Sequence, residues 1–291
     1  MTPAPAIPSF RALTDRRVRV KALNIGANDN DGHAPPYAAL LQAGDVDVVG
    51  FEPNLKALAE LNARKGPCET YLPHAIGDGG RHTLNMCFAP GMTSLLTPNP
   101  AVLKLFHAFP GWGEVLSTET VDTVRLDDIA ETAGAELLKI DIQGGELMAM
   151  RHAEARLRDL LVNHTEVEFL PMYVDQPLFG DIDLFLRQHG FVFHRFEPTV
   201  SRVIAPMLIN NDIYAGMSQL LWADAIFVKD FTRLELLTDE QMLSMAAIMH
   251  DCYRSFDLVL RLLVEHDARA GTQLGPTYLS RLRGERSGKA A

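Results

Sequence analysis

Short apolar runs alternate with longer segments whose apolar residues recur at helical spacing, from residue 18 to about residue 230. The apolar runs predict strands at 18–24, 46–51, 69–76, 120–126, 137–142, 161–170, 191–196 and 225–228, with a further extended segment at 82–88. The segments of helical spacing predict helices at 37–43, 54–63, 147–160 and 182–189. Strands that are separated by helices are typical of a parallel α/β sheet.

Two stretches interrupt this pattern. Residues 89–120 are rich in proline and glycine and carry the aromatic residues Phe106, Phe109 and Trp112, which predicts a long loop of functional importance. Those aromatic side chains either pack within the loop or stack on a sugar ring. The next run, at 120–126, leads to Asp127 and Asp128, which are predicted to cap a short helix. A second insert lies at 197–221, between the last two strands.

The pattern divides the chain into three parts. Residues 1–17 are predicted to form an N-terminal arm, residues 18–232 the α/β domain, and residues 233–291 a C-terminal helical extension with a loose tail. Thr238, with Gln241 three residues later, predicts the start of the first helix in that extension. The apolar stripe that follows is interpreted as core or as the interface of a homo-oligomer.

Composition excludes several classes of partner. The formal net charge of −10 argues against a nucleic-acid partner, because such proteins usually carry a basic face. No uninterrupted apolar stretch is long enough to span a bilayer, so no membrane partner is expected. Three widely separated cysteines and the lack of a signal-peptide pattern favour a cytoplasmic protein without disulfides.

A glycine turn and a later acid carry the main functional signal. Gly26 follows the first apolar strand, within Asn24-Ile25-Gly26-Ala27-Asn28, and Glu52 ends the second strand. A turn of this kind lets a ligand approach the backbone, and the acid can accept hydrogen bonds from the two hydroxyls of a ribose. The pair therefore predicts a nucleoside-bearing cofactor without saying which one.

The motifs taken together resemble the FkbM family of S-adenosylmethionine-dependent methyltransferases. The resemblance rests on the glycine turn, Phe51-Glu52-Pro53, Leu126-Asp127-Asp128, Leu-Lys-Ile-Asp-Ile-Gln-Gly-Gly-Glu at 138–146 and Glu166-Val167-Glu168-Phe169, in that order. It implies a Rossmann-like, seven-stranded, mostly parallel sheet of the class I methyltransferase type, with an antiparallel last strand. It also implies O-methylation of a hydroxyl on a sugar, glycan or polyketide-type small molecule.

The resemblance also implies roles for individual residues. Gly26 and Asn28 would line the methionine part of S-adenosylmethionine, together with Asn24, which stands where the family usually has an acid. Glu52 would bind the ribose hydroxyls and Asp78 would lie beside the adenine. Two further acids, Asp141 and Glu146, would border the reaction centre, with Asp141 also counted among the cofactor-binding residues.

A small charged group is expected beside this reaction centre. Lys139 and Asp141 share one face of a strand, and Glu166 and Glu168 share a face of the next. Lys139, Asp141 and Glu166 are the candidate catalytic residues, with Asp141 or Glu166 positioning or deprotonating the acceptor. A structural ion pair between the two strands is the alternative. No metal ligand is assigned, although a divalent ion held by these carboxylates stays open.

Two other functions remain open. A nicotinamide-dependent dehydrogenase shares the glycine turn and the ribose-binding acid, but the turn lacks the full Gly-x-Gly-x-x-Gly form. A non-catalytic binding or assembly module on a degenerate methyltransferase fold is the second alternative. It is favoured by Asn24 and Asn30, which replace an expected acid and an expected glycine.

Overall fold

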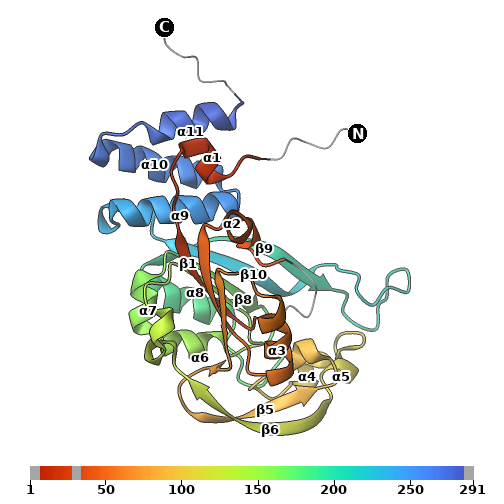
Figure 1. The fold of residues 1–291 in the computed structure, drawn as a ribbon. Coiled ribbons are helices and arrows are strands. Elements are labelled where there is room, and N and C mark those ends of the chain that lie inside the picture. Colours follow the sequence, from red (N-terminus) through yellow and green to blue (C-terminus); the bar gives the residue numbers. More distant parts are fainter. Residues whose placement is uncertain (1–6, 28–33, 285–291) are drawn as a thin grey trace. The chain divides into compact units, whose positions relative to one another are not determined.

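The computed structural model describes residues 7–27 and 34–284 and contains a seven-stranded sheet (Figure 1). Its strands run in the order β3 (Glu69–Leu72), β2 (Val46–Phe51), β1 (Val20–Ile25), β7 (Leu137–Ile140), β8 (Val162–Glu168), β10 (Gln219–Lys229) and β9 (Phe191–Arg202). The β1–β7, β7–β8 and β2–β3 pairs are parallel, whereas β10 runs antiparallel to both of its neighbours. The predicted α/β fold with a mostly parallel seven-stranded sheet is confirmed.

A second, three-stranded sheet has the order β4 (Ala75–Ile76), β6 (Val115–Val124) and β5 (Arg81–Cys87). The single strand predicted at 69–76 is wrong, because the chain leaves the large sheet after Leu72 and pairs with β6 from Ala75. The strand predicted to begin at residue 120 begins at Val115, since its exposed first half pairs with β5. Polar, exposed strand residues lack the apolar alternation that marked the other strands.

Helices α6 (Glu146–Arg151), α7 (Glu154–Asp159) and α8 (Phe179–Gln188) lie along one face of the large sheet (Figure 1). Alternate strand residues such as Leu23, Leu138 and Val167 point into the core beneath them. The intervening strand residues, including Lys139 and Glu166, therefore belong to the opposite face. This alternation separates the charged side chains from the apolar core.

The helix predicted at 147–160 is wrong, because it is broken into α6 and α7 at His152 and Ala153. Ala153 occupies the N-cap of α7 and has no side-chain acceptor. The Asp127 carboxylate replaces it, accepting hydrogen bonds from the backbone N–H of Ala155 at 2.9 Å and of Arg156 at 3.1 Å. Asp127 was predicted to cap the helix after it, but it caps α7 instead. Its own segment forms the short 3-10 helix η2 (Leu126–Asp128).

Asp127→Ala is expected to lower the free energy of unfolding by about 1–2 kcal/mol, because two backbone donors at the start of α7 lose their acceptor. Chemical unfolding in urea would measure the loss. Asp128→Ala is the matched control, since Asp128 is exposed and pairs with Arg125, and such pairs contribute less than about 0.5 kcal/mol. Equal effects of the two substitutions would contradict the capping role.

The segment at 89–120 is a packed insert rather than an open loop. It contains η1 (Pro90–Met92), α4 (Pro100–Leu103) and α5 (Phe109–Trp112), which share a second apolar cluster with Met172 and Tyr173. Phe106 and Phe109 are almost fully buried in that cluster, so of the two interpretations these rings support packing. Residues 197–202 and 219–221 of the second insert extend β9 and β10, and the Tyr214 ring between them stacks on Trp112.

The contacts divide the chain into two compact units, of which 22–33 with 48–229 is the larger. It also contains α3 (Leu55–Arg64) and η3 (Ala130–Thr132). The smaller unit, 1–21 with 34–47 and 230–291, contains α1 (Phe10–Thr14), α2 (Ala38–Ala43), η4 (Leu234–Leu236), α9 (Asp239–Asp251), α10 (Phe256–Ala270) and α11 (Leu274–Leu282). The capping box of Thr238 and Gln241 is confirmed at the start of α9. Across the described ranges, no helix has both the length and the apolar character needed to cross a membrane.

Candidate functional site

Gly26 forms a sharp turn directly after β1. Its φ is +78°, and a Cβ atom built there would lie 2.1 Å from the backbone oxygen of Asp141. The neighbouring strands hold this turn, since Ile25 accepts a hydrogen bond from the Asp141 N–H and Ala27 donates one to Phe51. Only glycine fits without displacing the end of β7. Asn28, which was predicted to follow on the ligand side, lies outside the described residues, as do Asn30 and Gly32.

Glu52 is buried where β2 ends. One oxygen of its carboxylate, Oε1, accepts a 2.8 Å hydrogen bond from the backbone N–H of Asn54, which is the N-cap of α3. Its own N–H donates to Leu72 on the neighbouring strand. These contacts fix the side chain at the carboxyl end of the sheet. A carboxylate only accepts hydrogen bonds and has about four lone-pair sites, which makes Glu52 a suitable partner for ligand hydroxyls.

Asp78 lies just after β4, in a turn that also contains Gly80. Three donors converge on its Oδ1 atom: the His82 ring at 2.8 Å, the Gly80 N–H at 2.7 Å and the Thr123 hydroxyl at 3.2 Å. The hydrogen bond from His82, followed by that from Gly80, lowers the pKa of Asp78 from 3.8 to about 2. Asp78 is therefore an ionised, fixed acceptor at neutral pH.

The lowered pKa predicts a pH dependence of stability. A carboxylate whose pKa falls on folding stabilises the protein above its unfolded pKa, and this stabilisation disappears as the pH falls through the folded pKa. Asp78→Asn should therefore cost about 1 kcal/mol near neutral pH, after reduction for solvent screening, and almost nothing near about pH 2. Urea unfolding at several pH values would measure the difference. Glu119→Gln, at an exposed position on β6, should leave the pH profile unchanged.

The predicted charged group is assembled around Asp141, just beyond β7. The Lys139 ammonium lies 3.3 Å from Asp141 Oδ2, as expected for side chains on one face of a strand. The Gln143 side-chain amide donates to Asp141 Oδ1 at 3.0 Å and to Glu166 Oε2 at 2.8 Å. Gln143 therefore bridges the two carboxylates that the sequence placed on adjacent strands.

Gln143 is itself held by residues that sequence reasoning missed. The Tyr173 hydroxyl lies 3.2 Å from Gln143 Oε1 and 3.2 Å from the Met92 carbonyl, and the Ser94 hydroxyl donates to the Gln143 carbonyl at 2.6 Å. Gln143 also adopts a positive φ of 58°, which is uncommon outside glycine. Ser94 and Tyr173 lie far from Gln143 in sequence and belong to no motif, so no sequence signal could have found them.

Burial separates the protonation states of the two bridged carboxyls. Burial, followed by the charges of Asp141 and Glu168, raises the pKa of Glu166 well above its usual value. Burial also tends to raise the pKa of Asp141, but the Lys139 charge and the hydrogen bond from Gln143 reverse this and lower it. Asp141 is thus ionised at neutral pH, whereas burial favours the neutral form of Glu166.

Two more acids border this pair. Burial raises the pKa of Glu146 to about 7, although the Ile142 N–H donates to its Oε1 at 2.7 Å. Burial, followed by the charges of Glu146 and Asp141, raises the pKa of Glu168 well above its usual range. Four acidic side chains therefore share a site with one ammonium group, that of Lys139. Such separated pKa values are typical of functional sites.

The sequence-predicted residues thus fall into two sets. Gly26, Glu52 and Asp141 each follow the carboxyl end of a strand of the large sheet, the position at which open α/β sheets bind ligands, whereas Asp78 follows β4 of the small sheet. Glu52 and Asp78 are acceptors, and an acceptor is what ribose hydroxyls and an exocyclic amine require. These two acceptors fit a nucleoside.

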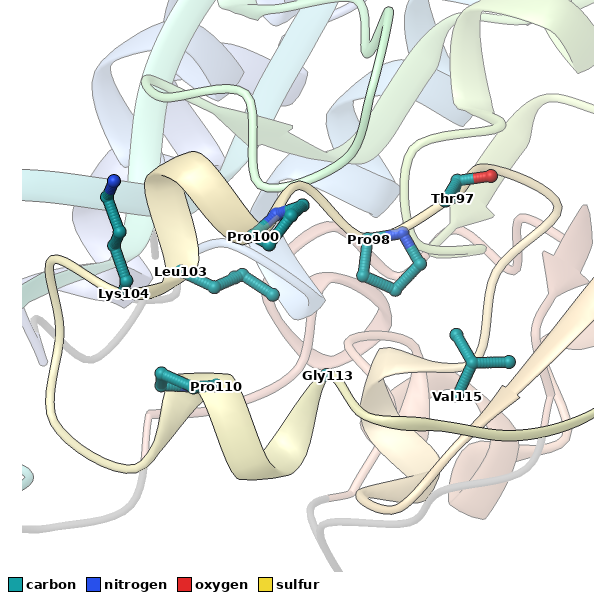
Figure 2. Close-up of a pocket in the computed structure, with 8 residues that line it drawn as sticks. All are labelled: Thr97, Pro98, Pro100, Leu103, Lys104, Pro110, Gly113 and Val115. Carbon is teal, nitrogen blue, oxygen red and sulfur yellow. The ribbon is translucent and has the colours of Figure 1, made fainter.

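A shallow apolar pocket of about 290 Å³ opens in the packed insert (Figure 2). It is lined by Thr97, Pro98, Pro100, Leu103, Lys104, Pro110, Gly113 and Val115. One hydrogen bond connects the pocket to the charged site. Val174, which follows the Tyr173 that contacts Gln143, donates its N–H to the carbonyl of the pocket residue Thr97. No acid of the charged group lines this pocket, so it is a separate apolar feature of the same unit.

Comparison with known proteins identifies one family. The family model described as the methyltransferase FkbM domain matches residues 24–193, which is more than half of the chain. The match begins at Asn24 in β1, includes the Gly26 turn and the whole charged group, and ends in β9. A search of curated proteins found no match.

Proposed function

Because the chain belongs to the FkbM methyltransferase family, we propose that it transfers a methyl group from S-adenosylmethionine to a hydroxyl oxygen. The acceptor is a sugar, glycan or polyketide-type small molecule. The observation that carries this proposal is the apposition of Gly26 and Asp141 at the carboxyl ends of adjacent parallel strands. It supports a cofactor site bordered directly by an ionised carboxylate.

Four residues fit the cofactor. Glu52 would accept from the ribose hydroxyls, and Asp78, whose three donors all bind Oδ1, would accept from the adenine amine through its other oxygen. Asn24 and Gly26 would lie along the methionine part. When bound, S-adenosylmethionine would supply a methyl group on a sulfonium, which is transferred to an aligned oxygen nucleophile as the C–S bond breaks and S-adenosylhomocysteine leaves.

Asp141 is the residue best suited to act on the acceptor. Its carboxylate is ionised and about one-third exposed, so an acceptor hydroxyl can reach it. It would hold the proton that this hydroxyl loses, while Lys139 and Gln143 keep the carboxylate in place. The raised pKa of Glu166 favours its neutral form, so Asp141 is the better base of the two.

The apolar pocket of the insert is separate from the charged group, so it would hold an apolar part of the acceptor that extends away from the reacting hydroxyl. In Figure 2 the side chains of Pro98, Leu103 and Val115 surround one hollow. Ring faces of sugars and the carbon skeletons of polyketides both bury apolar surface in pockets of this kind. We assign the pocket to the acceptor rather than to the cofactor.

Calorimetric titration with S-adenosylhomocysteine tests the cofactor assignment. Glu52→Ala should raise the dissociation constant by about 10- to 100-fold, because hydrogen bonds from hydroxyls to a carboxylate contribute about 1.5–3 kcal/mol. Glu119→Ala, an exposed control, should leave it unchanged. Incubation with tritium-labelled S-adenosylmethionine and a panel of sugars, glycans and polyketides would then identify the acceptor.

Three results would overturn the proposal. Absence of S-adenosylhomocysteine binding at millimolar concentration would favour a non-catalytic module. Tighter binding of a nicotinamide cofactor would favour a dehydrogenase. Cofactor binding that is unaffected by Glu52→Ala would remove the ribose assignment.

A further inference from the structure

Three carboxylates converge from different elements. Asp141 follows β7, Glu146 begins α6 and Glu166 lies in β8, yet each places one oxygen within 4.8 Å of the oxygens from the other two. Oxygen ligands of one ion, each about 2.0–2.6 Å from it, lie at most about 4–5 Å apart. The spacing of these oxygens therefore fits a single bound cation.

The local positive charge is too small for this group of acids. Lys139 pairs with Asp141 at 3.3 Å, but within the described part of the chain no Lys or Arg lies within ion-pair distance of Glu146 or Glu166. Buried carboxylates without a counter-charge are costly, so they take up protons or bind a cation.

Glu168 is an independent sign of a missing ligand. Its side chain is 1% exposed, and neither carboxylate oxygen has a hydrogen-bond partner among the residues that the structure describes. It lies two residues after Glu166 on β8, so its side chain is on the face of the sheet that carries the cluster. The Nε2 atom of Gln176 is likewise buried without a hydrogen-bond partner in the described part of the chain. Native proteins rarely leave such groups unpaired.

We propose that Asp141, Glu146 and Glu166 bind one divalent cation, and that Glu168 helps to hold this site without contacting the cation. The ligand set is all oxygen, without histidine or cysteine, which selects hard ions such as Mg²⁺, Mn²⁺ or Ca²⁺. Hydrogen bonds occupy one oxygen each of Glu146 and Glu166, so both carboxylates keep acceptor capacity. Asp141, whose side chain is 34% exposed, provides the open side of the site.

The ion would act at the centre assigned to the acceptor. Beside Asp141 it would stabilise the negative charge that develops on the acceptor oxygen. This role rests on the proposed function, whereas ion binding itself does not. The two can therefore be tested separately.

Electron paramagnetic resonance of free Mn²⁺ measures the binding directly. The full chain, stripped with EDTA and freed of it by gel filtration, is titrated with Mn²⁺ in the absence of any cofactor. We expect one saturable site with a dissociation constant below about 1 mM, and displacement of Mn²⁺ by Mg²⁺ or Ca²⁺. Glu166→Gln and Glu146→Gln should each weaken binding at least about 10-fold. Glu119→Gln removes the same charge from exposed β6 and should bind as the wild type does.

Circular dichroism checks that each variant is folded. If Glu146→Gln does not fold, then Glu166→Gln and Asp141→Asn decide the question. The proposal is overturned if the wild type shows no saturable site up to about 10 mM Mn²⁺, or if folded cluster variants bind like the wild type. Calorimetry with S-adenosylhomocysteine in EDTA tests the proposed function independently, so the failure of one proposal is distinguishable from the failure of the other.

Discussion

Asp141→Asn is expected to lower kcat for methyl transfer by about 100-fold or more at saturating S-adenosylmethionine and acceptor. Asparagine keeps the shape of the side chain and can still accept a hydrogen bond from Gln143, but it cannot take up the acceptor proton. The loss should therefore appear in kcat. Transfer of tritium-labelled methyl groups to the acceptor identified in the panel would measure it.

The same substitution distinguishes catalysis from structure. If Asp141 serves only as the ion-pair partner of Lys139, Asp141→Asn should reduce stability and leave kcat within about threefold of the wild type. If it serves only the cofactor, the Michaelis constant for S-adenosylmethionine should rise while kcat is retained. Asp122→Asn, at an exposed position on β6, is the matched control and should change neither parameter.

Much of the fold could be predicted because its central strands are buried. The strand at 46–51 was predicted with its observed limits, since nearly all of its residues are apolar and buried. The second half of β9 and the first half of β6 were missed, because their partly or fully exposed residues carry no apolar alternation. The break between α6 and α7 was missed because its cause, Asp127, lies in another segment.

The candidate site was also predicted only in part. The sequence correctly predicted that Lys139 and Asp141 share a face and that Glu166 lies on the adjacent strand, because strand alternation and strand order determine both. It did not predict Gln143 as the bridge, since that contact depends on a positive φ and on Tyr173 from a distant segment. Contacts between distant segments depend on side-chain packing, which has no period in the sequence.

The Gln143 bridge explains how one site can hold acids in different protonation states. Its amide donates to both Asp141 and Glu166, so it brings the two carboxyls together without neutralising either. The Lys139 charge then favours ionisation of Asp141, while burial favours the neutral form of Glu166. Without a bound cation, Asp141 is therefore the better proton acceptor of the two.

Gly26→Ala is expected to lower the free energy of unfolding by about 3–5 kcal/mol. Part of this is the cost of a side chain at a φ of +78°, about 1–2 kcal/mol. The rest arises because the new Cβ atom would lie 2.1 Å from the backbone oxygen of Asp141, so β1 or the end of β7 must move. Urea unfolding of the purified variant would measure the total.

Gly134→Ala isolates the backbone-strain part of this effect. Gly134 has a similar φ of +71°, but a Cβ atom built there meets nothing within 4 Å. Gly134→Ala should therefore cost only about 1–2 kcal/mol, the backbone strain alone. The difference between the two variants measures how closely the glycine turn is packed against Asp141. If both variants lose the same stability, the turn is not held against β7, and the direct contact between the proposed cofactor site and the proposed base is lost with it.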